Sequence, residues 1–206
     1  MQGVHLIESM ANCALLTEDR LILIDTTDTT GAPDVVKYLK GTGYKPADIA
    51  SIVISHVHPD HVAGLAGLKA SSDAEVASHR IEADFIAKRE SYPGGRVLPH
   101  TATDVDVLLE DGDRYQDLRV IHAPGHTPGN IALLDEVHDL LIAGDSMRVE
   151  GGQIGPMMDR NNIDPAQHRD SMKKIAGFPF ESLIVGHGRA ITAGASDRLK
   201  EAVAKL

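Results

Sequence analysis

Hydrophobic residues recur along the chain in two kinds of pattern, each typical of one secondary structure. Short consecutive apolar runs bounded by charged residues or glycine predict buried strands, and stretches in which apolar residues recur every three or four positions predict helices. The strand-like runs cover residues 3–8, 12–17, 20–25, 51–55, 75–79, 118–123, 130–135, 139–144 and 182–188. The helix-like stretches cover residues 33–43, 62–70, 80–90, 164–177 and 195–206. Helices interspersed among strand runs predict a layered α/β protein, with two sheets packed together and helices outside.

Local signals sharpen two of the predicted helices. Asp164 followed by Pro165 is typical of a helix N-cap and first helical position, because the carboxylate accepts free backbone N–H groups and proline needs no donor there. In the helix predicted at residues 80–90, Ile81, Phe85 and Ile86 are spaced to share one face. These three side chains are therefore expected to face the core together.

Composition narrows the class of protein. The 206 residues contain 30 acidic and 20 basic side chains, a formal net charge of −10, no tryptophan and few other aromatic residues. Dispersed basic residues and few aromatic side chains argue against nucleic acid as a partner and leave a small-molecule substrate as the expectation. No linker-like stretch divides the chain, so one domain over residues 1–206 is expected.

The N-terminal stretch lacks the basic start and apolar core of a secretory signal, and no apolar run reaches the roughly 18 residues that suggest a membrane span. Cys13 is the only cysteine, which excludes an intrachain disulfide. It lies in an apolar run, which favours a buried structural thiol over a nucleophile. A cytoplasmic protein with no membrane partner is expected.

The sequence IVISHVHPDHVAG, at residues 52–64, concentrates candidate metal ligands after a strand-like run. In extended chain, residues two apart point the same way, so His56 and His58 can aim two imidazoles at one point. Asp60 and His61 follow where the chain turns into a helix and can serve a second metal ion. Imidazole with carboxylate suits Zn, and also Fe or Mn, and the absence of a nearby cysteine argues against a closed thiolate site.

Three further candidate ligands each follow a strand-like run. They are His126 in APGHTPG, Asp145 in AGDS and His187 in VGHG. The neighbouring glycines let the backbone approach a crowded centre. Each motif alone is weak, but their common position after a strand favours a joint role.

Together, LILIDTT, SHVHPDH, APGHTPG, AGDS and VGHG, in this order and over nearly the whole chain, resemble the metallo-β-lactamase fold hydrolases. That group includes glyoxalase II, quorum-sensing lactonases and RNase Z-type nucleases. The resemblance implies a four-layer αββα sandwich. The aspartate at the bridging position and the lack of a ligand cysteine place the resemblance on the glyoxalase II and lactonase side.

The resemblance also implies roles for individual residues. One metal ion would be held by His56, His58 and His126, the other by Asp60, His61 and His187, with Asp145 bridging both. A further aspartate, Asp25, matches a family residue buried under the site and is expected to support the ligands without binding metal itself.

Two divalent ions, for which Zn is the expectation and Fe or Mn the alternatives, can share a water, lower its pKa and hold hydroxide for attack on a carbonyl or phosphoryl centre. Asp60 has a spare carboxylate oxygen with which to orient that nucleophile and carry its proton. The sequence therefore predicts a dinuclear metal-dependent hydrolase of a small ester, thioester or lactone. The alternatives are a mononuclear iron persulfide dioxygenase-like oxidoreductase and a phosphodiesterase or nuclease of the same fold.

Candidate substrate-binding residues lie in two segments. Residues 89–104 contain Tyr92 and Arg96 and read either as a loop over the site or as a surface connection. Residues 147–162 read as a hairpin around two glycines followed by a turn with Met157 and Met158, which suit an apolar pocket wall or core packing. In the same segment Arg148 suits an anionic group or a surface salt bridge.

Overall fold

The apolar run at residues 49–54 forms strand β4 (Ile49–Ile54), an inner strand of a six-stranded sheet, in the computed structural model of the protein, which describes residues 3–93 and 98–206. This strand pairs in parallel with β3 (Leu21–Ile24) on one side and β5 (Glu75–His79) on the other. A parallel strand is covered on both faces, so it requires apolar residues at successive positions. That requirement explains why the IASIVI sequence shows little polar alternation.

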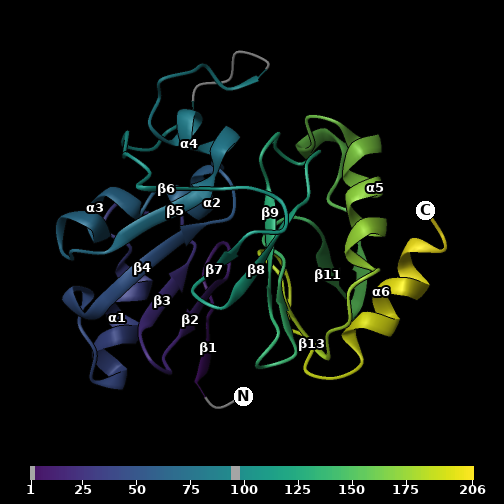
Figure 1. Cartoon of the computed structure of the whole chain (residues 1–206), viewed down its shortest axis with the longest axis horizontal. Coiled ribbons are helices and arrows are strands. Elements are labelled where there is room, and N and C mark those ends of the chain that lie inside the picture. The colour runs from purple at the N-terminus through teal and green to yellow at the C-terminus, as the bar shows by residue number, and fades with distance from the viewer. Residues whose placement is uncertain (1–2, 94–97) are drawn as a thin grey trace. The chain divides into compact units, whose positions relative to one another are not determined.

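The strands of this sheet follow the order β1-β2-β3-β4-β5-β6. Strands β1 (Val4–Ile7), β2 (Cys13–Leu16) and β3 are joined antiparallel, and β6 (Val107–Leu109) lies at the opposite edge. The helical segments between the strands are α1 (Pro33–Thr42), η1 (Pro46–Asp48), α2 (Pro59–Val62), α3 (Leu65–Ala70) and α4 (Arg80–Ile86). Helices α1 and α3 pack their apolar residues against those of the sheet in one buried cluster that includes Leu39, Leu65, Leu23 and Ile52 (Figure 1).

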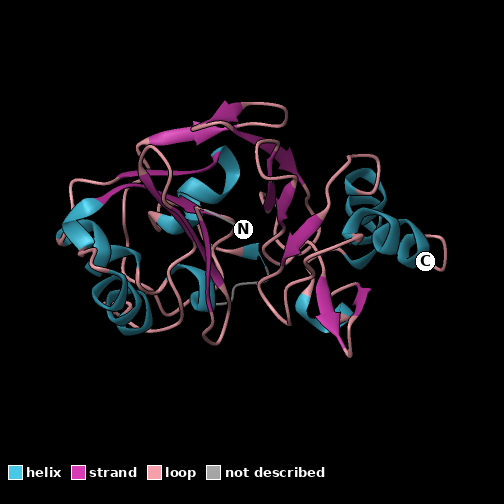
Figure 2. Ribbon diagram, turned by 90° about the horizontal axis from the view of Figure 1, so that it is seen from below, coloured by secondary structure: helices cyan, strands magenta, loops and turns pink. Residues whose placement is uncertain are grey.

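A second sheet has the strand order β13-β10-β9-β8-β7. Its strands are β7 (Arg114–Tyr115), β8 (Leu118–His122), β9 (Ile131–Asp135), β10 (Leu140–Ile142) and β13 (Ser182–Ile184). Helices α5 (Pro165–Ile175) and α6 (Ala195–Val203) lie next to each other, in Figure 1 and again in Figure 2. Their apolar residues share one core with the strands, in which Met172 and Leu199 meet Leu141 and Leu183. A hairpin of β11 (Arg148–Glu150) and β12 (Gln153–Gly155) and a 3-10 turn, η3 (Asp159–Asn161), precede α5.

The chain divides into two compact units, residues 1–108 and residues 109–206, each built around one of the two sheets. The expectation of a single domain over residues 1–206 therefore stays a prediction. Within residues 3–93 and 98–206, no helix is long and apolar enough to cross a membrane.

The predicted α/β class is confirmed, and several of the local features predicted from the sequence are present. The carboxylate of Asp164 accepts the backbone N–H groups of Ala166 and Gln167 at the start of α5. The predicted hairpin turns at Gly151 and Gly152, both with positive φ. Burial raises the pKa of the Cys13 thiol well above its usual value, as expected for a structural cysteine.

Other expectations are wrong. The helix predicted at residues 62–70 is interrupted at Gly64, where an added Cβ would lie 2.3 Å from the carbonyl oxygen of Thr26. In α4, Phe85 and Ile86 are buried as predicted, but Ile81 is 41% exposed and Glu82 takes the buried place. The helix has only seven residues, so the buried face follows the neighbouring sheet and not the longer apolar period. The sequence does not predict the short strands β6 and β7, because two or three residues are too few to show a periodic pattern.

Candidate metal-binding residues

In the first unit, the candidate ligands lie at the carboxyl ends of parallel strands. The chain leaves β4 at Ile54, and His56 and His58 follow in extended conformation before α2 begins. Asp60 and His61 lie in α2 itself, with Asp60 Oδ2 4.0 Å from His61 Nε2. Because β3, β4 and β5 run in the same direction, residues just after each strand meet at one edge of the sheet.

Asp25, the first residue after β3, is hydrogen-bonded to the segment that carries the candidate ligands of this unit. Its carboxylate accepts hydrogen bonds from the Ser55 backbone N–H (2.8 Å) and the Ser55 hydroxyl (2.7 Å), and lies 2.7 Å from His61 Nδ1. A carboxylate only accepts hydrogen bonds, so the proton of the neutral His61 ring is on Nδ1 and the lone pair is on Nε2. That Asp25 supports a metal ligand without binding metal itself stays a prediction, with which these contacts are compatible.

The backbone around Asp25 is strained. Asp25 has φ 62° and Thr27 has φ 73°, the left-handed region that a β-branched residue rarely adopts. Between them, Thr26 donates both its backbone N–H (2.7 Å) and its hydroxyl (2.9 Å) to the carbonyl oxygen of His61. Thr26 of this strained turn therefore binds the backbone of His61, while Asp25 binds its ring. Backbone strain of this kind concentrates at functional sites.

Ser55 fixes the tautomer of the next residue. Its hydroxyl hydrogen goes to Asp25, so its oxygen accepts from His56 Nδ1 at 3.1 Å. That leaves the lone pair of His56 on Nε2. Ser55 is thus a hydrogen-bonding partner of both Asp25 and His56.

Glu82 and Tyr92 also contact the segment that carries the candidate ligands, at Val57 and His58. Glu82, fully buried on α4, accepts the backbone N–H of Val57 at 2.8 Å. Tyr92 is only 7% exposed, and its hydroxyl lies 3.0 Å from His58 Nε2, so a protein group engages this nitrogen of the ring. Nothing in the sequence distinguishes Glu82, because a lone glutamate in a helix-like stretch has no characteristic pattern. The sequence makes Tyr92 a candidate for substrate binding, and the structure places its hydroxyl against a candidate metal ligand.

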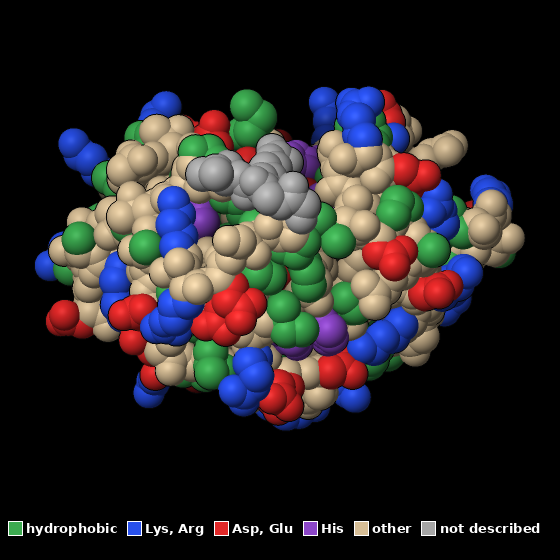
Figure 3. All heavy atoms as spheres, turned by 90° about the horizontal axis from the view of Figure 1, so that it is seen from above, with side chains coloured by type: hydrophobic (Ala, Val, Ile, Leu, Met, Phe, Trp, Pro, Cys, Tyr) green, Lys and Arg blue, Asp and Glu red, His purple; other side chains and the backbone are tan. Residues whose placement is uncertain are grey.

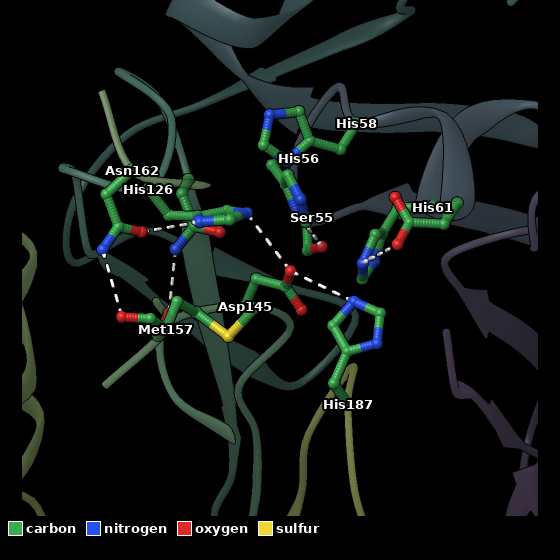
Figure 4. Close-up of polar contacts among 12 residues, drawn as sticks. Ser55, His56, His58, His61, His126, Asp145, Met157, Asn162 and His187 are labelled. Atoms are coloured by element: carbon green, nitrogen blue, oxygen red, sulfur yellow. Dashed lines mark hydrogen bonds and ion pairs between the residues drawn. The ribbon is translucent and has the colours of Figure 1, made fainter. Parts of the chain in front are cut away.

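In the second unit, His126, Asp145 and His187 also meet at one edge of a sheet. They follow β8, β10 and β13, which run in the same direction because β8 and β10 are both antiparallel to β9 and β13 is parallel to β10. Asp145 Oδ2 lies 3.2 Å from His126 Nε2 and 3.4 Å from His187 Nε2 (Figure 4). Asp145 is 2% exposed and His126 is 1% exposed.

These distances and tautomers fit a metal ion. Ligand atoms bound at the usual zinc distances to one tetrahedral ion lie about 3.3 Å apart, close to both separations at Asp145. His126, like His56 and His61, has Nδ1 engaged by a protein group, here the side chain of Asn162 at 2.9 Å, which leaves Nε2 for a metal. The donors are imidazoles and carboxylates, which suit Zn, Fe and Mn. That the two sets of ligands form one dinuclear centre stays a prediction.

Gly125, next to His126, has a backbone conformation and a close contact that only glycine accommodates without strain. Its φ is 120°, and an added Cβ would lie 2.2 Å from the backbone nitrogen of His168. We expect Gly125→Ala to lower the free energy of unfolding by about 2 to 4 kcal/mol, from backbone strain and a clash with the helix. Urea denaturation measures this. Gly155→Ala, where a Cβ meets nothing within 4 Å, is the control. Equal stability of the two variants would contradict the close packing of this loop on α5.

The remaining candidate residues lie as follows. The guanidinium of Arg148 donates to the Pro156 carbonyl oxygen at 3.1 Å and pairs with Glu150 at 2.7 Å, as in the salt-bridge alternative. Met157 is 4% exposed and Met158 is 39% exposed. Arg96 lies outside the described residues. On the face seen in Figure 3, Lys and Arg side chains are interspersed with Asp and Glu.

Known proteins match this chain over most of its length. The family model described as the metallo-beta-lactamase superfamily matches residues 6–187. The probable metallo-hydrolase YflN of Bacillus subtilis is 26% identical, over 83% of this chain and 76% of its own. A hydroxyacylglutathione hydrolase of Cereibacter sphaeroides is 30% identical, over 68% of this chain and 48% of its own. The crystal structure of TTHA1623 in a di-iron-bound form superposes with a TM-score of 0.71 at 27% identity, covering 95% of this chain and 97% of that one.

Proposed function

The chain belongs to the metallo-beta-lactamase superfamily, and from that premise we propose that it is a dinuclear metal-dependent hydrolase of a small ester, thioester or lactone. The observation that carries the proposal is the hydrogen bonding of the candidate ligands. For four of the candidate histidine ligands, one ring nitrogen is hydrogen-bonded to a protein group that is not itself a candidate ligand. Such outer partners are what fix the orientation of metal-bound imidazoles.

In this proposal the seven ligands divide as the family resemblance implies. His56, His58 and His126 would hold one ion, Asp60, His61 and His187 would hold the other, and Asp145 would serve both. The position of one Asp145 oxygen close to both His126 and His187 supports the bridging role. The di-iron form of TTHA1623 supports a pair of ions and leaves Fe beside Zn and Mn as the metal.

Bound metal ions would supply Lewis acidity and a water of lowered pKa. The chain's own residues do the rest. Asp60, whose side chain is 27% exposed, has one carboxylate oxygen to spare for orienting the attacking water, taking up its proton and returning it to the leaving group. Asp25, Ser55 and Tyr92 hold the imidazoles before substrate arrives, so little reorganisation is needed during the reaction.

The substrate class follows from charge and from one relative. A net charge of −10, with basic side chains interspersed among acidic ones, disfavours a polyanionic substrate, so a small carbonyl compound is the better fit. The relative named hydroxyacylglutathione hydrolase supports a thioester as one member of the class. We also propose that the enzyme works in the cytoplasm without a nucleic-acid or membrane partner.

A substrate panel tests this function. The metal-loaded protein is assayed with an acyl-homoserine lactone, S-lactoylglutathione, an aryl ester, a cephalosporin, a bis-aryl phosphodiester, and glutathione persulfide with oxygen uptake followed. We expect kcat/KM of about 10⁴ M⁻¹s⁻¹ or more for at least one ester, thioester or lactone. Hydrolysis of the phosphodiester alone would replace the proposal with a nuclease-like function. Oxygen uptake with the persulfide would replace the hydrolase by an oxidoreductase.

A further inference from the structure

The segment from Met157 to Asp164, between the hairpin and α5, is bound closely to the loop that carries His126. The backbone N–H of Ile163 donates to the His126 carbonyl oxygen at 3.2 Å, and that of Asp164 donates to the Gly125 carbonyl oxygen at 2.9 Å. Two residues of one strand-to-helix connection are thereby paired with the residues at and before a candidate ligand. The connection is placed to control the orientation of the His126 ring.

The Asn162 side chain makes the direct contact with that ring. Its Oδ1 lies 2.9 Å from His126 Nδ1, and its Nδ2 lies 3.4 Å from the Met157 carbonyl oxygen (Figure 4). The carbonyl can only accept a hydrogen bond, so the amide nitrogen must face Met157 and the amide oxygen must face His126. An amide oxygen in turn accepts only, which requires the proton of the His126 ring to be on Nδ1.

His168 of α5 is hydrogen-bonded to Met157, the residue whose carbonyl oxygen faces the Asn162 amide. Its Nε2 accepts the backbone N–H of Met157 at 3.1 Å, and its side chain is fully buried. A backbone N–H can only donate, so Nε2 of His168 carries the lone pair that this bond needs. The chain of contacts therefore runs from α5 through Met157 and Asn162 to His126.

We propose that Asn162 is a positioning residue that holds His126 in the Nδ1-protonated tautomer, with Nε2 available to a metal ion, and that His168 acts on His126 through Met157 and Asn162. The inference rests on the proposed function for its purpose, since a fixed Nε2 lone pair matters only if His126 binds metal. The contact between Asn162 and Nδ1 does not depend on metal, although Nε2 of the metal-free ring also faces Asp145 Oδ2 at 3.2 Å and can carry a proton of its own.

The test compares three variants. Asn162→Ala removes the acceptor for His126, Asn162→Asp keeps an acceptor oxygen at that place, and Asn161→Ala changes an exposed neighbour as the control. Competition with a chromophoric chelator measures zinc affinity. We expect Asn162→Ala to weaken zinc binding by about 10- to 100-fold, which is the usual effect of losing the partner of a metal-binding histidine. Asn162→Asp should retain most of the affinity, and Asn161→Ala all of it.

Imidazole nitrogen NMR of the metal-free protein gives a second readout that needs no metal. Wild type and Asn162→Asp should show a proton on His126 Nδ1, and Asn162→Ala should show less protonation at Nδ1, whatever the state of Nε2 beside Asp145. An Asn162→Ala variant with the wild-type tautomer and affinity would overturn the inference. If wild type binds no zinc but the tautomer shifts as expected, the proposed function fails and the positioning role of Asn162 stands.

The part of His168 is tested by a double-mutant cycle. His168→Leu removes the acceptor for the Met157 N–H and should weaken zinc binding on its own. Because it acts through Asn162, it should cause little further loss in the Asn162→Ala background. Additive losses would overturn the indirect action of His168 and leave that of Asn162 intact.

Discussion

Removal of metal by a chelator is expected to lower hydrolysis of the best substrate by about 10³-fold or more, because metal ions contribute several kcal/mol to such a reaction. Activity should return on addition of close to two equivalents of Zn per chain, since seven candidate ligands are too many for one tetrahedral ion. The measurement is a titration of metal-free protein, with bound metal and turnover recorded at each point. Separate titrations with Fe and Mn identify the ion that gives the highest activity.

Magnesium serves as the control for this titration, because it prefers oxygen ligands and the proposed site is rich in imidazole. Full turnover by metal-free protein would refute the proposed mechanism. Complete recovery with a single iron, together with oxygen uptake on the persulfide, would favour the dioxygenase alternative.

The Asp60→Asn variant is expected to lose about 10²- to 10⁴-fold in kcat, the usual contribution of a positioned acid or base. Asparagine keeps one oxygen at the ligand position but cannot take up a proton. Asp60→Ala removes both functions, so it should lose as much turnover and also bind metal more weakly. Because the Asp60 side chain is 27% exposed, neither change should much reduce the stability of the fold.

Metal content, melting temperature and kcat are measured side by side for these variants. Asp73→Ala, at an exposed aspartate of the same unit, controls for the loss of one surface charge. Wild-type turnover in Asp60→Asn at wild-type metal content would show that Asp60 carries no proton in the reaction, even if it binds metal.

Much of the secondary structure was readable from local signals. The continuous apolar run of β4, the Asp164–Pro165 start of α5 and the paired glycines of the hairpin each act within a few residues, through burial, backbone hydrogen bonding or permitted φ. Their effects do not depend on what lies across the sheet, so a single sequence carries them. The face of α4 was not readable in this way, because the neighbouring residues of the first unit decide whether Ile81 or Glu82 is buried.

The same distinction between local and distant determinants separates the candidate ligands from the residues that support them. His56, His58, Asp60 and His61 were found because they share one short segment, whose spacing alone brings them together. Their supporting partners are distant in sequence, as Asp25 is from His61 and Glu82 from Val57. Only the adjacency of parallel strands, whose carboxyl ends meet at one edge, brings those partners within hydrogen-bonding distance.

The contact between Asn162 and His126 was decided by tertiary structure alone. An asparagine in a turn looks the same in sequence whether it faces solvent or a histidine ring. Here the backbone pairing of residues 163 and 164 with residues 126 and 125 brings the amide to the ring. The sequence by itself thus determined which residues have the chemistry to bind metal, because that chemistry belongs to the side chain. The tertiary structure determined which nitrogen each ring presents, because a tautomer is set by the partner that the fold brings to the other nitrogen.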